Sequence, residues 1–180
     1  MRDGSGCTAM SPESFVTSLE QAGWKICRKV RRLHLPAEVT SRYLALPPIW
    51  VSFVQQIERC VNPGETAWFL TEEDFSGASG SAYRWDEFER MSLAAAEGDQ
   101  KLENEIRGFW NRHLPILISV KSGYGYIAIR VGKSGGPVVY GIEPEFENAS
   151  PLAGSLEEFF DVFEGHVARG HRVKALEAMV

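Results

Sequence analysis

Apolar residues recur at helical spacing through the first third of the chain. Ser11-Pro12 predicts a helix start, because serine caps a helix N-terminus and proline fits its first turn. Residues 24–33 are expected to form a second short helix that His34-Leu35-Pro36 ends. A longer amphipathic helix is predicted over 47–61. Its apolar face recurs at i, i+3, i+4, i+7 and i+11, and consists of Trp50, Phe53, Val54, Ile57 and Val61.

The middle of the chain alternates between short apolar runs and segments rich in glycine or acid. Ala67–Leu70 is a strand candidate that enters an acidic loop, and 75–81 has the composition of a flexible linker. Two helices are predicted in an insert at about 81–112, with Gly98-Asp99 between them. Their expected apolar faces are formed by Trp85, Phe88 and Ala95 and by Leu102, Ile106, Phe109 and Trp110.

Three strands are expected after the insert. Ile116–Val120 is a short apolar run, and Tyr124–Val131 alternates between its two faces. Val138–Ile142 is the third strand, and short connections such as Gly132–Gly136 join all three. Such connections are typical of an antiparallel meander.

A final helix begins at Ser155, which fits a capping box with Glu158 and is followed by a phenylalanine-rich face that Gly170 ends. Helices, then a meander, then a closing helix indicate an α+β fold. We therefore expect one domain over 1–180, with a central antiparallel sheet packed by flanking helices.

Composition places the chain among ordinary single-domain proteins. It has 180 residues, of which 44% are hydrophobic and 24% charged. Its three cysteines, Cys7, Cys27 and Cys60, are widely spaced, which argues against a disulfide framework and a zinc site. The N-terminus lacks the apolar region of a signal peptide, and no apolar run is long enough to span a bilayer. We expect a cytoplasmic protein that does not enter membranes.

Charge is distributed unevenly along the chain. Residues 25–32 contain five bases, whereas 134–168 contain seven acids and no lysine or arginine. Because the chain is acidic overall, with a net charge of −5, and the basic stretch is short, nucleic-acid binding is not expected. The acidic runs are either solvated faces or a surface that steers a basic partner.

Catalytic motifs are not found. Gly132-Lys133-Ser134 lacks the upstream glycine of a phosphate-binding loop and precedes a strand. His166 and His171 are five residues apart, so a helix would place them on different faces. Glu143 and Glu145 flank Pro144 and are interpreted as solvated loop charges rather than an acid–base pair. The sequence predicts no enzyme activity, no cofactor and no metal site.

Three motifs, in this order, resemble the SMI1/KNR4 family, also called the SUKH superfamily. Leu46-Pro47-Pro48-Ile49-Trp50-Val51-Ser52-Phe53 looks like that family's LPP helix, and Asn62-Pro63-Gly64 loosely matches the turn after it. The meander follows, and 152–160, ending in SLEEFF, is similar to the helix that closes those domains. The resemblance covers a core of about 46–163, with a helical N-terminal extension at 11–34 and the helical insert at about 81–112.

This resemblance implies a binding role. Many bacterial members of the family look like immunity proteins that neutralise a cognate toxin of a contact-dependent or polymorphic system, often a nuclease. The alternative is a non-catalytic regulatory scaffold, the role of eukaryotic members. For the immunity role we expect a basic toxin domain as partner, and a chain that is a monomer or a weak homodimer.

A partner-binding surface is predicted where acids flank the strand ends. Aromatic side chains in the loops, Phe75, Tyr83 and Phe146, would supply anchoring contacts. Because these segments flank strand ends, they could lie together at one edge of the sheet, and the sequence leaves open whether the acids form one patch. The predicted contact residues are Glu72, Glu73, Asp74, Phe75, Glu143, Glu145, Phe146 and Glu147.

Overall fold

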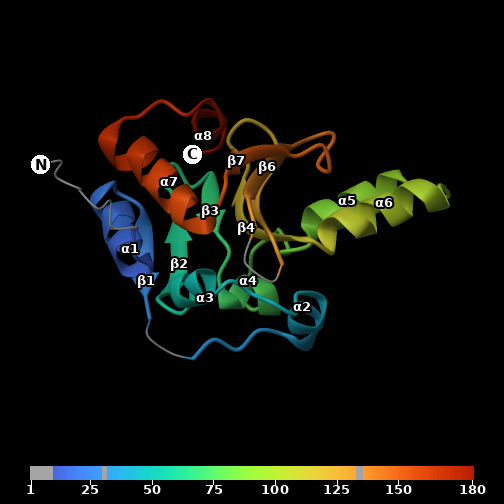
Figure 1. Ribbon diagram of the computed structural model, residues 1–180, viewed down its shortest axis with the longest axis horizontal. Coiled ribbons are helices and arrows are strands. Elements are labelled where there is room, and N and C mark those ends of the chain that lie inside the picture. Colours follow the sequence, from blue (N-terminus) through green and yellow to red (C-terminus); the bar gives the residue numbers. More distant parts are fainter. Residues whose placement is uncertain (1–9, 30–31, 133–135) are drawn as a thin grey trace, which may run out of the picture.

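A single antiparallel sheet in sequential strand order organises the protein (Figure 1). The computed structural model describes residues 10–29, 32–132 and 136–180. Within them seven strands pair in the order of the chain. They are β1 (Lys25–Arg28), β2 (Ile57–Val61), β3 (Ala67–Phe69), β4 (His113–Ser119), β5 (Gly125–Arg130), β6 (Val138–Ile142) and β7 (Ser150–Ala153).

Eight helices accompany the sheet over the same residues. Among these described helices none is both long and apolar enough to cross a membrane. They are α1 (Pro12–Gln21), α2 (Ala37–Arg42), α3 (Pro48–Val54), α4 (Glu72–Ser76), α5 (Glu87–Ala95), α6 (Gln100–Trp110), α7 (Leu156–Arg169) and α8 (Lys174–Met179).

The main core lies between the first strands and a layer of three helices. Helices α1, α3 and α7 contact one another beside β1–β3. Phe15 of α1 stacks on Phe160 of α7 with 4.1 Å between ring centroids, and Phe53 of α3 lies 5.6 Å from Phe15. Phe69 of β3 meets Phe53 at 5.1 Å. This aromatic cluster explains why the phenylalanine-rich face of the last helix faces inward.

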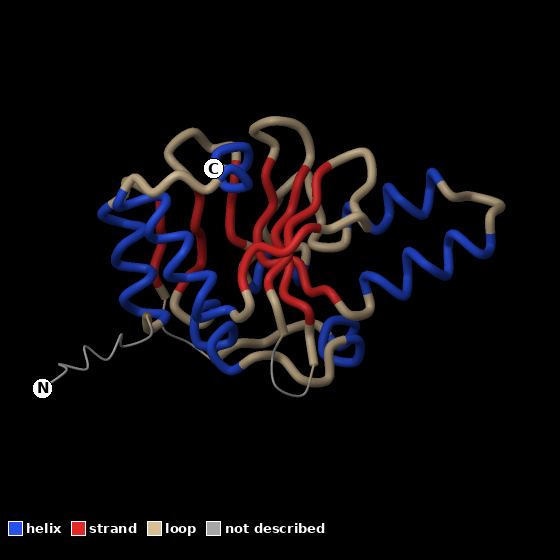
Figure 2. Tube along the Cα trace, turned by 45° about the horizontal axis from the view of Figure 1, so that its top comes forward, coloured by secondary structure: helices blue, strands red, loops and turns tan. Residues whose placement is uncertain are grey.

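Helices α5 and α6 lie side by side and project away from the sheet (Figure 1, Figure 2). A second aromatic cluster holds their base. Phe88 of α5 stacks on Phe146 at 4.6 Å, and Trp110 of α6 packs on Tyr126 of β5 at 4.8 Å. We call residues 86–111 the arm.

Several predictions from the sequence are confirmed. The α+β class and the β4–β5–β6 meander are as expected. Ser11 caps α1, and Ser155 caps α7 by accepting a hydrogen bond from the backbone N–H of Glu158. Gly170 ends α7 in the left-handed region, and Gly98-Asp99 separates α5 from α6. Helices α2 and α8 and strand β7 were not predicted.

The predicted helix over 47–61 is wrong in its second half, where β2 begins at Ile57. The pairing of β1 with β2 shifts register between Cys27 and Arg28, so that Glu58 has no direct partner. Such a bulge inserts one residue into the strand. As a result Ile57 and Cys60, three residues apart, are both buried, and the strand imitates a helical period.

Two further predictions are wrong. Lys25–Arg28 is a strand, not a helix, because Gly23 adopts φ +86° and Trp24 donates to the carbonyl of Leu19, which closes α1. The expected acidic loop at 72–74 is the first turn of α4, so the expected linker at 75–81 begins as helix. Cys7, part of the 25–32 stretch (30–31) and the middle of the Gly132–Gly136 connection (133–135) lie outside the described residues.

Candidate partner-binding surfaces

The acids that follow β3 build a helix start instead of an open surface. Asp74 is buried and accepts hydrogen bonds from the Thr71 backbone N–H (2.8 Å) and hydroxyl (2.9 Å), which makes a capping box for α4. Glu72 pairs with Lys29 at 3.5 Å, and both side chains are largely buried. Glu73 lines the cleft described below.

The two aromatic residues predicted as anchors are core residues. Phe75 is 2% exposed and packs against Trp50, while Phe146 is 3% exposed and stacks on Phe88. The sequence interpretation was wrong to place them on the surface, since both rings fill the interior between helices and sheet. Tyr83 is half-buried beside Trp68, 5.8 Å between centroids.

The three glutamates after β6 have different surroundings. Glu143 and Glu145 are exposed, and Glu143 accepts a hydrogen bond from the Tyr124 backbone N–H at 3.1 Å. Glu147 is half-buried and accepts hydrogen bonds from Trp110 Nε1 (2.5 Å) and the Ser92 hydroxyl (3.2 Å). Glu147 therefore fastens the arm to the sheet.

The structure does not bring the two acidic groups together. Neighbouring strands of a meander run in opposite directions, and β3 and β6 are three strands apart. The segments that follow β3 and β6 therefore leave the sheet at opposite ends. In Figure 1 α4 lies at the lower end of the sheet and the connection from β6 to β7 at the upper end. The question that the sequence left open is thereby answered: the two acidic groups do not form one contiguous patch.

The arm also carries more acids than bases. Its 26 residues (86–111) contain seven acids and three bases, a net charge of −4, compared with −5 for the whole chain. Around its free end Glu97, Asp99 and Glu105 are exposed, and Leu102 is 43% exposed. The sequence showed these acids and the helical insert, but nothing in it showed that the two helices project.

The arm is fixed to the body by charged contacts as well as by rings. Arg42 of α2 donates two hydrogen bonds, at 2.6 and 2.8 Å, to the carboxylate of Glu89 in α5. The Arg42 guanidinium also lies 5.8 Å from the ring centroid of Trp85. With the bonds to Glu147, these contacts fix the base of the arm against the body.

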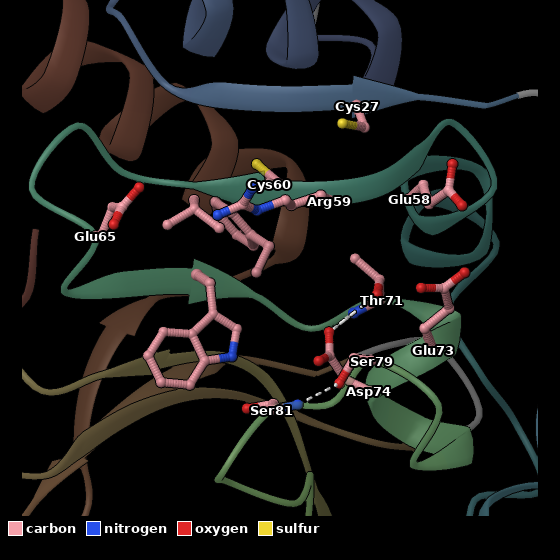
Figure 3. A pocket seen from close by; sticks show the side chains of 13 residues that line it. Cys27, Glu58, Arg59, Cys60, Glu65, Thr71, Glu73, Asp74, Ser79 and Ser81 are labelled. Atoms are coloured by element: carbon pink, nitrogen blue, oxygen red, sulfur yellow. Dashed lines mark hydrogen bonds between the residues drawn. The ribbon is translucent and has the colours of Figure 1, made fainter.

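A cleft of about 480 Å³ opens on the face of β1–β3 (Figure 3). Its walls are β1 and β2 on one side and α4 with the segment after it on the other. Arg59 and Cys27 lie on the strand side, while Ser79 and Ser81 lie opposite, with the Ser81 backbone N–H hydrogen-bonded to the Ser79 hydroxyl at 3.2 Å. The indole of Trp68 lines the same cleft.

The charges around this cleft are mostly paired. Lys25 donates a 2.6 Å hydrogen bond to Glu65, and this bond lowers the pKa of the Glu65 carboxyl. Arg28 of the basic stretch binds both carboxylate oxygens of Glu20 at 2.7 Å. Arg59 is exposed and has no hydrogen bond or ion pair with any residue that the structure describes. The cleft lining therefore combines the Arg59 guanidinium with carboxylates, hydroxyl groups and an indole face.

The two described cysteines differ in their access to solvent. Cys27 is exposed at the cleft, whereas burial raises the pKa of the Cys60 thiol. Over the described ranges no three His, Cys, Asp or Glu side chains gather closely enough to hold a metal ion.

Comparison with known proteins found no matching family model, no matching curated protein and no matching solved structure.

Proposed function

We propose that this chain is a protein-binding domain that neutralises a basic toxin domain in the bacterial cytoplasm. The observation that carries the proposal is the projecting arm, which exposes the carboxylates of Glu97, Asp99 and Glu105. The toxin as partner comes from the resemblance of the LPP helix, the meander and the SLEEFF helix to SMI1/KNR4 immunity proteins. The arm supplies a physical reason for a basic partner that the resemblance alone does not provide.

Charge of this kind acts at long range. A toxin that cleaves nucleic acid has a basic cleft, because it must hold phosphate groups. Carboxylates presented on a projecting element attract that cleft during diffusion and then compete for it. Because the arm is anchored by Glu147 and Arg42, its acids are held in place before binding. Binding then loses less conformational entropy than docking of a flexible loop would.

The test has two stages. The tagged chain is first used to capture partners from cells that express it naturally, and the partners are identified by mass spectrometry. Each partner is then expressed in a test host, alone and together with the chain. The proposal predicts a stoichiometric basic partner that stops growth when expressed alone and is harmless with the chain.

The other outcomes separate the alternatives. A partner that is harmless alone and whose activity the chain does not inhibit would support a regulatory scaffold of the SMI1/KNR4 type and contradict neutralisation. Capture of no stoichiometric partner from cells that express the neighbouring genes would contradict both. The test variant has Glu97 and Glu105 changed to lysine and should capture the toxic partner less well while keeping the fold, whereas a variant with Glu13 and Glu145 changed to lysine is the matched control.

A further inference from the structure

A second cleft, of about 460 Å³, lies at the root of the arm. It is lined by residues of α2, α5 and α6 and of the segments next to them. Three of the residues that line this cleft are arginines. Its polar lining consists of Arg42, Arg90, Arg107, Asn111, Asp86 and Glu89.

Both acids in this cleft are already paired. Arg84 donates a 2.9 Å hydrogen bond to Asp86. Glu89 accepts two hydrogen bonds from Arg42, at 2.6 and 2.8 Å, and the two side chains are only 10% and 18% exposed. Glu89 is therefore held by Arg42 and Asp86 by Arg84, so neither carboxylate is hydrogen-bonded to Arg90 or Arg107.

Arg90 and Arg107 are the cations that remain. Arg90 of α5 lies 3.7 Å from Glu87, and Arg107 of α6 lies 3.7 Å from Glu103. These distances are too long for hydrogen bonds, and the two arginine side chains are 55% and 54% exposed. Ion pairs between neighbouring turns of one helix contribute little to stability. A ligand can therefore draw both guanidinium groups away from Glu87 and Glu103.

Arg42 provides a second observation. Its Nε is buried and has no acceptor among the described residues, although its two terminal nitrogens are bonded to Glu89. Because both terminal nitrogens hold the Glu89 carboxylate, the Arg42 side chain forms a fixed part of the cleft wall. The amide of Asn111 adds a further donor at the cleft wall.

We propose that the cleft at the root of the arm binds a small ligand through its phosphate group. Two guanidinium groups on neighbouring helices, each able to make two parallel hydrogen bonds, suit the oxygens of a phosphate dianion. The cleft volume lies within the range of small-molecule sites. The cleft lining contains three arginines and two acids although the arm as a whole is acidic, and the proposal is independent of toxin binding.

The full chain is titrated with phosphate compounds. Binding is monitored through the backbone amide NMR signals of the arm. Inorganic phosphate, phenyl phosphate and pyrophosphate are compared at constant ionic strength set by chloride. We expect saturable shifts near Arg90 and Arg107 for all three. Tighter binding of phenyl phosphate indicates a phosphate ester as the natural source, and tightest binding of inorganic phosphate indicates the free ion.

Variants distinguish this site from general attraction of anions. Arg90→Ala and Arg107→Ala should each weaken phosphate binding about tenfold, as expected for the loss of one charge-assisted contact. The matched control is Arg59→Ala, because Arg59 is also an exposed arginine beside a cleft. Equal loss in all three variants, or shifts that do not saturate with phosphate, would overturn the proposal. Amide spectra of each variant without ligand check that the fold is kept.

Discussion

The indole Nε1 of Trp110 donates a 2.5 Å hydrogen bond to the carboxylate of Glu147, and so joins the arm to the loop before β7. Glu147→Ala leaves the N–H of the buried Trp110 without its charged acceptor. We expect the free energy of unfolding to fall by about 2 kcal/mol. Chemical denaturation measures this change. Glu145→Ala is the control, since its exposed side chain should contribute at most about 0.5 kcal/mol. Equal stability of both variants would show that Glu147 does not anchor the arm.

The bidentate pair of Arg42 and Glu89 is expected to contribute more than any exposed pair. Removing either partner leaves a largely buried charge, so each alanine variant should lose about 3 kcal/mol of unfolding free energy. In a double-mutant cycle we expect a coupling of about 1–3 kcal/mol. The control cycle uses Lys101 and Glu105, 3.9 Å apart and exposed, where about 0.5 kcal/mol or less is expected. A coupling as small as the control would contradict the anchoring role.

Asp74 is expected to act on folding and not on a partner. Asp74→Ala removes the acceptor for the Thr71 N–H and hydroxyl, and should lower the unfolding free energy by about 1–2 kcal/mol. Asp74→Asn keeps a neutral acceptor and should lose less. Thermal and chemical unfolding measure both variants. A variant as stable as the wild type would mean that the capping box does not stabilise α4.

Stability should depend on pH through His113. This side chain stacks on Phe109 at 4.0 Å, and burial lowers its pKa below the ordinary value of 6.5. The unfolded chain therefore binds the proton more readily than the folded chain does. The stability contributed by neutral His113 is complete above pH 6.5 and is lost as the pH falls through the lower folded pKa.

Denaturation from pH 5 to pH 7 tests this dependence. The wild type should become more stable across that range. His113→Phe keeps a ring against Phe109 but cannot titrate, so its stability should change less with pH. An identical slope in the variant would assign the dependence to other groups.

The fold class could be predicted from the sequence, but the exact strand set could not. Alternation in 124–131 and the capped helix from Ser155 follow from local rules, and both are present. The boundary between α3 and β2 does not follow from local rules, because the bulge at Glu58 gives the buried residues Ile57 and Cys60 a helical spacing. A bulge forms through pairing with β1, which lies about 30 residues earlier, and local periodicity cannot reveal it.

The candidate surface was predicted less well, for two physical reasons. An aromatic residue between acids, such as Phe75 or Phe146, looks like a surface anchor until the helices that cover it are known. The separation of the two acidic groups could have been found by counting strand reversals between Ala67–Leu70 and Val138–Ile142. Amphipathic spacing in α5 and α6 predicts a shared apolar seam, but not that the pair projects from the sheet.

The most direct test of the central claim is the association rate between the captured partner and an arm variant, measured at low and high salt. Glu97→Lys with Glu105→Lys reverses exposed charges on the arm, and Glu13→Lys with Glu145→Lys is the matched control. We predict that the arm variant associates at least about tenfold more slowly at low salt, that the difference shrinks at high salt, and that the control stays within about twofold of the wild type. An arm variant that associates at the wild-type rate at low salt would contradict the account.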